Sequence, residues 1–301
     1  MKLTTAAVIP TRNRPVDLTH AVQSIIGQTQ PPDELIIVDQ SADDDSENAV
    51  RALCAGNRHT ELIYIHDRQI AGLVDAKRVG SARSRSDVVC FLEDDVVLEP
   101  NYIAAIASAF VSCPDMVGCG GVITNPPASS SIYLTAHRFF FRGIFRDPRP
   151  AVFAHAEARR DQLIRCDILS GGVSAWRRDV FEKVPFDTRN GLHMFEDMDF
   201  ATRVVRTFGH HLYVNPLARL AHYGSPLNRD VHGARQRRKV SEAITFYKKR
   251  RDWRGAAVGL AMGLTWWLAE AAFQAVKNRS TGPLLGYCRG AVDGVRRPVV
   301  S

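Results

Sequence analysis

The first 125 residues alternate between short apolar runs and amphipathic stretches, and this rhythm limits the fold more than any other feature. The run ELIIVD at 34–39 is almost wholly apolar and rich in β-branched residues, which is typical of a strand buried on both faces. The stretch 16–27 places its apolar residues on one helical stripe and ends at a glycine. The same patterns predict strands at 6–10, 61–66, 87–93 and 116–123, and helices at 46–55, 72–84 and 101–112. Such alternation predicts the α/β class, with a mostly parallel central sheet flanked by helices.

The rhythm breaks after residue 125. The segment 125–165 contains a proline pair, a serine triplet and three consecutive phenylalanines, and we expect it to be irregular with some helix. Regular elements return as a strand or loop entering a helix over 168–184, a helix over 195–209 and a strand within 213–224. We therefore predict a domain over 1–225, with halves 1–124 and 125–225, followed by a C-terminal region over 226–301.

Composition and missing motifs remove several function classes. Apolar residues make up 45% and charged residues 24% of the chain, as in soluble globular proteins and unlike disordered or multi-span membrane proteins. The sequence has no GxGxxG after its first strand, no GxxxxGK[ST] and no GxSxG. The six cysteines form no CxxC pair, and the first ten residues make a poor signal peptide. We expect reduced, buried thiols and a catalytic part in the cytosol.

Three consecutive acids, Glu93, Asp94 and Asp95, follow the apolar run that ends near residue 92. Residues two apart on an extended segment point to the same side, so Glu93 and Asp95 can face one ligand. Mg²⁺ and Mn²⁺ prefer oxygen ligands, and a bound cation would relieve the repulsion among these carboxylates. An exposed acidic loop without a ligand is the alternative interpretation.

A second acidic group, Glu196 and Asp197 followed by Asp199, opens the helix expected over 195–209. Acids in the first turn of a helix complement the helix dipole, which explains them without any catalytic role. A carboxylate at such a position can instead act as a general base towards an acceptor hydroxyl. Both interpretations remain open from the residues alone.

Taken in order, six segments resemble a known family. They are VIPTRNRP, ELIIVDQSADD, GLVDAKRVGSA, FLEDDV, SGGVSAWRRDVF and FEDMDF, which together cover about residues 5–225. The ordered set is similar to the family 2 glycosyltransferases, which have the GT-A fold. The resemblance implies metal-assisted, inverting transfer of a hexosyl group from a nucleoside-diphosphate sugar. It makes 1–124 the nucleotide-sugar-binding half and 125–225 the acceptor and catalytic half.

The resemblance also assigns roles to individual residues. Donor nucleotide binding is implied for Pro10, Thr11, Arg12, Asp39, Lys77 and Asp94. A Mg²⁺ or Mn²⁺ site is implied for Glu93, Asp95 and His222. Asp197 is implied to be the catalytic base, together with Glu196, and Gly171 and Gly172 a flexible loop near the donor sugar and acceptor.

The chain departs from the family pattern at three positions. Gln40 follows Asp39 where the family often has glycine. Lys77 stands where arginine is usual, and its point charge lacks the planar fork of a guanidinium. The first acid of the triplet is Glu93 instead of the shorter aspartate, so which acid contacts the ribose is open.

The positive charge of the chain is concentrated at its C-terminal end. Residues 1–225 carry 24 Lys and Arg against 27 Asp and Glu, whereas 226–301 carry 15 against 5. The basic cluster at 248–251 precedes the segment 255–276, which has one charged residue in 22. That segment can form a helix packed on the protein, a helix on an anionic membrane surface or a membrane span. All three interpretations stay open.

We expect an enzyme of cell-surface glycan or polysaccharide biosynthesis that acts on a glycan or lipid-linked acceptor. It would work in the cytoplasm, with contact to the cytoplasmic membrane face through 226–276, and whether it forms a homo-oligomer is open. An inactive sugar-nucleotide-binding protein is one alternative. A nucleic-acid-binding protein is a weaker one, because the basic region matches no nucleic-acid-binding fold.

Overall fold

The computed structural model of the chain describes residues 3–70, 72–126, 130–225 and 232–300. The chain forms two compact units. Unit 1 comprises 1–126, 148–186 and 200–228, and unit 2 comprises 127–147, 187–199 and 229–301. The expected divisions near 125 and 225 lie close to two of these breaks. The segments 127–147 and 187–199, however, belong with the C-terminal helices and not with the sheet.

Unit 1 contains a mixed sheet that runs through most of its length. Within the described residues it has nine strands in the order β3-β2-β1-β4-β8-β6-β9-β5, and β7 pairs with β9. The predicted parallel arrangement is found in β3-β2-β1-β4, while β8, β5 and β7 join antiparallel and β6 pairs parallel with β9. The strands are β1 (Thr5–Thr11), β2 (Glu34–Asp39), β3 (Glu61–His66), β4 (Val88–Leu92), β5 (Val96–Leu98), β6 (Gly118–Ile123), β7 (Ile164–Arg165), β8 (Val173–Arg177) and β9 (Leu212–His222).

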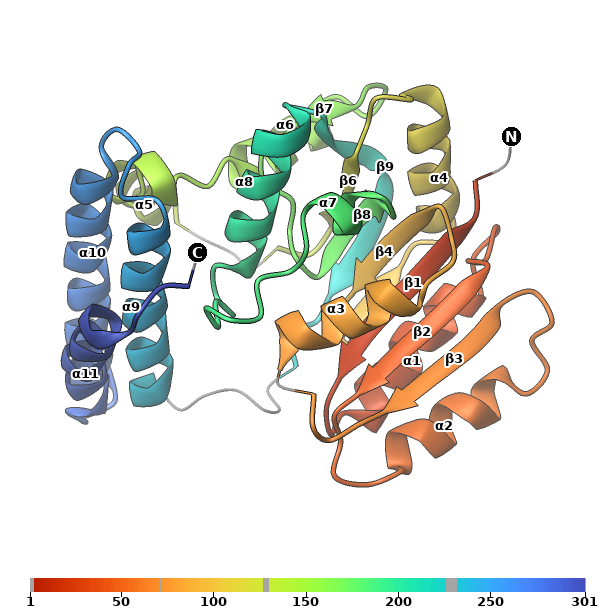
Figure 1. Ribbon diagram of the computed structural model, residues 1–301, viewed down its shortest axis with the longest axis horizontal. Helices are drawn as coiled ribbons and strands as arrows, with labels where there is room; N and C mark the ends of the chain where they lie inside the picture. The colour runs from red at the N-terminus through yellow and green to blue at the C-terminus, as the bar shows by residue number, and fades with distance from the viewer. Residues whose placement is uncertain (1–2, 71, 127–129, 226–231, 301) are drawn as a thin grey trace. The chain divides into compact units, whose positions relative to one another are not determined.

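Helices cover both faces of this sheet (Figure 1). Alternate residues of β1, β2 and β4 point to opposite faces, so each strand contributes to two apolar clusters. One cluster includes α1 (Pro15–Ile26), α2 (Asp45–Cys54) and α4 (Tyr102–Ser112). The other includes α3 (Leu73–Arg83), α6 (Arg149–Ala158), α7 (Val180–Lys183) and the later part of α8 (Glu196–Phe208). All six residues of β2 are buried, as expected for a strand covered on both sides.

Two features of the sheet position the candidate site. The parallel register of β1 and β2 sets Thr11 opposite Asp39, so the carboxyl ends of the two strands meet at one edge. The short strand β5, which the sequence patterns did not predict, pairs with the end of β9 and sets Val96 opposite His222. This pairing brings the acids that precede β5 next to the late histidine.

Unit 2 is helical. It contains α5 (Ser131–Phe140), the 3₁₀ turn η1 (Gly143–Phe145), α9 (His232–Lys249), α10 (Ala256–Lys277) and α11 (Gly282–Arg296). Its core is aromatic, with rings from three separate chain segments in contact: Phe145, Phe195, Phe246 and Trp267. Helices α9 and α11 approach so closely that a Cβ on Gly290 would lie 2.4 Å from the Arg237 carbonyl oxygen. The segment expected to be irregular after residue 125 therefore contributes α5 and η1 to this unit, and α6 and β7 to unit 1.

Helix α10 corresponds to the apolar segment singled out in the sequence. By length and composition it is able to cross a membrane, and within the described residues it is the one helix that meets both criteria. All six cysteines are free. Cys90, Cys119 and Cys166 are buried as expected, whereas Cys54 and Cys113 are only partly buried. Cys288 on α11 is exposed, because it faces away from the glycines that contact α9.

Candidate active site

The acidic triplet forms the link between β4 and β5. Strand β4 ends at Leu92 and β5 begins at Val96, so Glu93, Asp94 and Asp95 lie where the chain changes direction. The His222 Nε2 atom lies 2.8 Å from Glu93 Oε2 and 3.1 Å from Asp95 Oδ1. Ligand atoms of Glu93, Asp95 and His222 all lie within 4.8 Å of one another, so the two acids face one position, as the spacing predicted.

The charges in this cluster are mutually dependent. Hydrogen bonds to Asp95 and Glu93 raise the pKa of His222 to about 10. Burial alone would raise the pKa of Asp95, but hydrogen bonds from His222 and from the Ser225 backbone N–H (2.7 Å) hold that pKa below its ordinary value. A protonated imidazole thus supplies the positive charge that the two carboxylates require. A divalent cation is the other species able to supply that charge at the same place.

The middle acid points to different partners. Asp94 Oδ2 accepts a hydrogen bond from Thr11 Oγ1 at 2.8 Å, and Asp94 Oδ1 pairs with Arg14 Nη1 at 2.8 Å. Burial raises the pKa of Asp94 to about 6, and the Arg14 guanidinium limits that rise. The Arg14 Nη1 atom also lies 3.9 Å from Asp95. Sequence reasoning missed Arg14, although the second arginine of PTRNRP stands only two residues after the predicted Arg12.

The first-strand loop occupies the adjacent edge. Pro10 and Thr11 end β1, with Thr11 buried and Pro10 partly exposed, and Arg12 follows with its side chain exposed. Of these three, Thr11 is joined to the acidic triplet by a hydrogen bond. Contact of Pro10 and Arg12 with a donor stays a prediction.

Asp39 at the end of β2 is fully buried. Its Oδ2 accepts a hydrogen bond from the Tyr64 hydroxyl at 2.6 Å, and its Oδ1 accepts one from the Ser41 backbone N–H at 2.8 Å and another from the Ser41 hydroxyl. The carboxylate is thus satisfied by residues of β3 and the β2–α2 loop. Its predicted contact with the base of the donor stays a prediction.

The loop of Gly171 and Gly172 lies directly against Glu93, one member of the metal-type cluster that Glu93, Asp95 and His222 form. A Cβ on Gly172 would lie 2.1 Å from Glu93 Oε1, so only glycine leaves room for the observed Glu93 side chain. The Lys77 Nζ atom donates to the Gly171 carbonyl oxygen at 2.8 Å, and Lys77 is almost completely buried on α3. Lys77 therefore fixes the loop that carries Gly171 and Gly172. Its predicted contact with a diphosphate remains untested.

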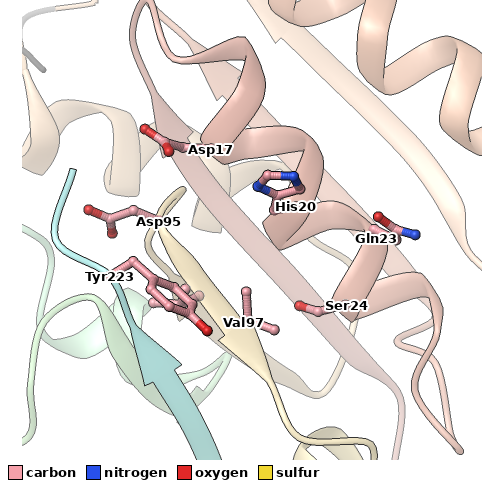
Figure 2. Close-up of a pocket in the computed structure, with 8 residues that line it drawn as sticks. Asp17, His20, Gln23, Ser24, Asp95, Val97 and Tyr223 are labelled. Carbon is pink, nitrogen blue, oxygen red and sulfur yellow. The ribbon is translucent and has the colours of Figure 1, made fainter. Parts of the chain in front are cut away.

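A cavity of about 490 Å³ opens beside Asp95. Figure 2 shows Asp17, His20, Gln23 and Ser24 on α1 along one side, with Asp95, Val97 and Tyr223 opposite them. Asp95 thus borders both the metal-type cluster and a space large enough for part of a small substrate. The sequence patterns gave no indication of this cavity, because its walls come from α1, β5 and the residue after β9.

The second acidic group belongs to unit 2. Glu196 is buried at the start of α8, and Asp197 Oδ1 accepts a hydrogen bond from the Met198 backbone N–H at 2.7 Å. Asp199 is ion-paired with Lys249 at 2.8 Å and with Arg250 at 3.0 Å. Asp199 is therefore a structural acid, whereas Asp197 is only partly buried.

Comparison with known proteins decides the family. The model of glycosyl transferase family 2 matches residues 6–184, which is more than half of the chain and includes the acidic triplet and the glycine loop. The chain belongs to this family. It is 22% identical over 228 residues to the glucosyl-dolichyl phosphate glucuronosyltransferase of Haloferax volcanii, covering 74% of this chain and 69% of that protein.

Two solved structures are similar to this glycosyltransferase. The mannosyltransferase PcManGT from Pyrobaculum calidifontis, in complex with GDP-Man and Mn²⁺, has a TM-score of 0.64 at 15% identity, covering 98% of this chain and 88% of that one. GalNAc-T7 with UDP, GalNAc and Mn²⁺ has a TM-score of 0.57 at 16% identity, covering 83% of this chain and 50% of that one. These likenesses establish the GT-A fold. The predicted family and the fold class are confirmed.

Proposed function

We propose that this glycosyltransferase transfers a hexosyl group from a nucleoside-diphosphate sugar to an acceptor hydroxyl, with inversion and with Mg²⁺ or Mn²⁺ as cofactor. The observation that carries the proposal is the convergence of Glu93, Asp95 and His222 within 4.8 Å. In open α/β sheets, ligands bind outside the carboxyl ends of the strands, which is where this cluster lies.

The cluster fits a divalent cation by the chemistry of its donors. Two carboxylates and an imidazole suit Mn²⁺, and the carboxylates alone suit Mg²⁺. A cation held by Glu93, Asp95 and His222 would supply positive charge next to the departing diphosphate. Asp94, held by Arg14 and Thr11, provides a polar wall beside it for the donor nucleotide.

Asp197 is the proposed base for the acceptor hydroxyl. Glu196 and Asp199 are more buried, and Asp199 is committed to two cations, so Asp197 is the acid of this group best suited to exchange a proton with a substrate. A base that removes the proton as the hydroxyl attacks the anomeric carbon directly gives an inverted product. The loop of Gly171 and Gly172 is proposed to border the donor sugar.

The acceptor is proposed to be a glycan or a lipid-linked sugar of cell-surface glycan or polysaccharide biosynthesis. The name of the Haloferax volcanii relative includes a dolichyl phosphate, which supports a lipid-linked acceptor here. The basic and apolar region 226–276 would then hold the enzyme at the cytoplasmic face of a membrane. Nucleic acid is not a proposed partner.

A screen of nucleotide sugars for Mn²⁺-dependent hydrolysis by the purified chain tests this function. We expect one donor to be hydrolysed, with activity lost in a chelator and restored by Mn²⁺ or Mg²⁺. A chain that binds a nucleoside diphosphate in calorimetry yet hydrolyses and transfers no donor would instead be the inactive binding protein. Product analysis by NMR with the accepted donor would then establish the anomeric configuration.

A further inference from the structure

One side of α10 is exposed. Between Ala256 and Val276, all of which the structure describes, this side carries no charged residue. At 3.6 residues per turn, the exposed positions fall within an arc of about 160°. They are Ala257, Val258, Ala261, Thr265, Leu268, Ala269, Ala272, Phe273 and Val276. The hydroxyl of Thr265 is hydrogen-bonded to the Ala261 carbonyl oxygen, so the face is apolar along the length of the helix.

The opposite side of α10 is packed inside unit 2. Gly259, Gly263, Trp267 and Ala271 are buried, and a Cβ on Gly259 would lie 2.8 Å from the Arg142 carbonyl oxygen. Glu270, the one charged residue before the end of the helix, pairs with Lys239 of α9 at 2.7 Å. Protein therefore occupies one side of the helix, and this arrangement is unlike a span surrounded by lipid.

Helix α5 packs beside α10 (Figure 1). Its Tyr133 and Phe140 rings pack against Trp266 of α10. Ile132 is 82% exposed and Phe139 is 52% exposed, and no residue of α5 is buried. Two neighbouring helices of unit 2 thus present large apolar side chains to the surroundings, and such exposed apolar patches mark interaction surfaces.

The charges around this surface are nearly all of one sign. Of the described residues in α5, α10 and the turns that flank α10, the exposed basic ones are Arg138, Arg251, Arg254, Lys277 and Arg279. Asp252 is the one exposed acid in the same set. An apolar face bordered by basic side chains matches the acyl boundary and headgroups of an anionic bilayer.

We propose that the exposed face of α10, together with Ile132 and Phe139 of α5, lies in the interface of an anionic bilayer, so that α10 is a one-sided membrane contact and not a span. This inference deepens the proposed function. It rests on that function only for the place where the enzyme would act, which is the surface of a membrane. It selects one of the three interpretations that the sequence left open.

Flotation with vesicles tests the proposal on the full chain. The probes are vesicles of phosphatidylcholine with phosphatidylglycerol, and vesicles of phosphatidylcholine alone. We expect flotation with the anionic vesicles at low salt, and at least a tenfold loss in the Leu268→Glu, Phe273→Glu double variant. The matched control is Val111→Glu with Leu217→Glu, which adds the same charge at exposed apolar positions of unit 1 and should float like the native chain. Circular dichroism checks that both variants fold.

Three results would overturn the proposal. One is absence of flotation with anionic vesicles, and another is equal flotation of the Leu268→Glu, Phe273→Glu variant. The third is retention of the chain in the vesicles after alkaline carbonate, which indicates a span. Light scattering without lipid measures whether a second copy of the chain covers this face instead. A dimer that dissociates in the Leu268→Glu, Phe273→Glu variant would also overturn the proposal. Donor hydrolysis in solution is measured in parallel. Flotation without hydrolysis would contradict only the proposed function. Hydrolysis without flotation would contradict only this inference.

Discussion

Among single residues, Asp197 carries the most specific expectation. Asp197→Asn should preserve donor binding and lower transfer by about 10²–10⁴-fold, because a neutral amide cannot accept the proton of the acceptor hydroxyl. Steady-state transfer and calorimetric donor binding measure the two effects separately. Near-native turnover would place the base elsewhere, and Glu196 would be the next candidate because Asp199 is paired with Lys249 and Arg250.

Asp95 is the residue whose removal should uncouple donor binding from the metal. Asp95→Ala takes one carboxylate from the cluster with Glu93 and His222, so Mn²⁺ should no longer strengthen binding of a nucleoside diphosphate. Calorimetry with and without Mn²⁺ measures this difference. The exposed acid Asp115 provides the control. It precedes β6, whose start pairs with the start of β9, whereas His222 ends β9, so Asp115→Ala should leave the metal effect intact. A full metal effect in Asp95→Ala would exclude Asp95 as a ligand.

Glu242 gives unit 2 a pH dependence. It is buried on α9, accepts a hydrogen bond from the Met194 backbone N–H at 2.6 Å, and burial raises its pKa from 4.5 to about 7. Between these two values the folded state keeps a proton that the unfolded state has lost, so stability falls as the pH rises through this window, by up to about 3 kcal/mol.

The variant Glu242→Gln has no such proton to lose. Its free energy of unfolding, relative to that of the native chain, should therefore increase from pH 5 to pH 8. Urea unfolding at several pH values between these limits measures the difference. A constant difference across this range would show that Glu242 ionises normally.

Among the elements, the α9–α11 contact depends on glycine. Gly290→Ala should destabilise unit 2 by roughly 1–3 kcal/mol through overpacking against the Arg237 carbonyl oxygen, although alanine is the better helix former. Gly282→Ala is the matched control at the start of the same helix, where the nearest atom to a new Cβ is the Ser280 hydroxyl at 3.3 Å. Thermal unfolding should separate the two variants. Equal melting temperatures would mean that the helices move apart at no cost.

The elements also differ in how well the sequence predicts them. Strands over 34–39 and 61–66 were predicted to the residue, because a continuous apolar run between polar turns has few other solutions. Strand β5 has three residues and no periodicity of its own, and its existence depends on pairing with β9. Because no local pattern predicts this pairing, only the family resemblance suggested that His222 joins Glu93 and Asp95. Arg14 and the cavity beside α1 likewise depend on tertiary contacts that no local pattern encodes.

For the whole molecule, the expected boundary at residue 225 has a testable consequence. The aromatic core of unit 2 combines Phe145 and Phe195 with Phe246 and Trp267, so a chain ending at residue 225 would expose the first two rings. We expect this truncation to aggregate or to lose donor turnover in solution, even with no membrane present. Size-exclusion chromatography and donor hydrolysis measure the outcome. A soluble, fully active truncated chain would show that 226–301 is a dispensable appendage.

Because segments of the two units alternate along the chain, the two units can complete their folding only at different stages of synthesis. All three segments of unit 1 have been made once residue 228 leaves the ribosome, so its sheet is able to close at that point. Unit 2 begins with 127–147 but needs Phe246 of α9 and Trp267 of α10 to bury its rings. The segment 187–199, with Asp197, therefore completes its aromatic packing only after α10 has been made, later than the sheet of unit 1. A partly made chain holds a finished sheet with its acidic triplet well before the proposed base is in place.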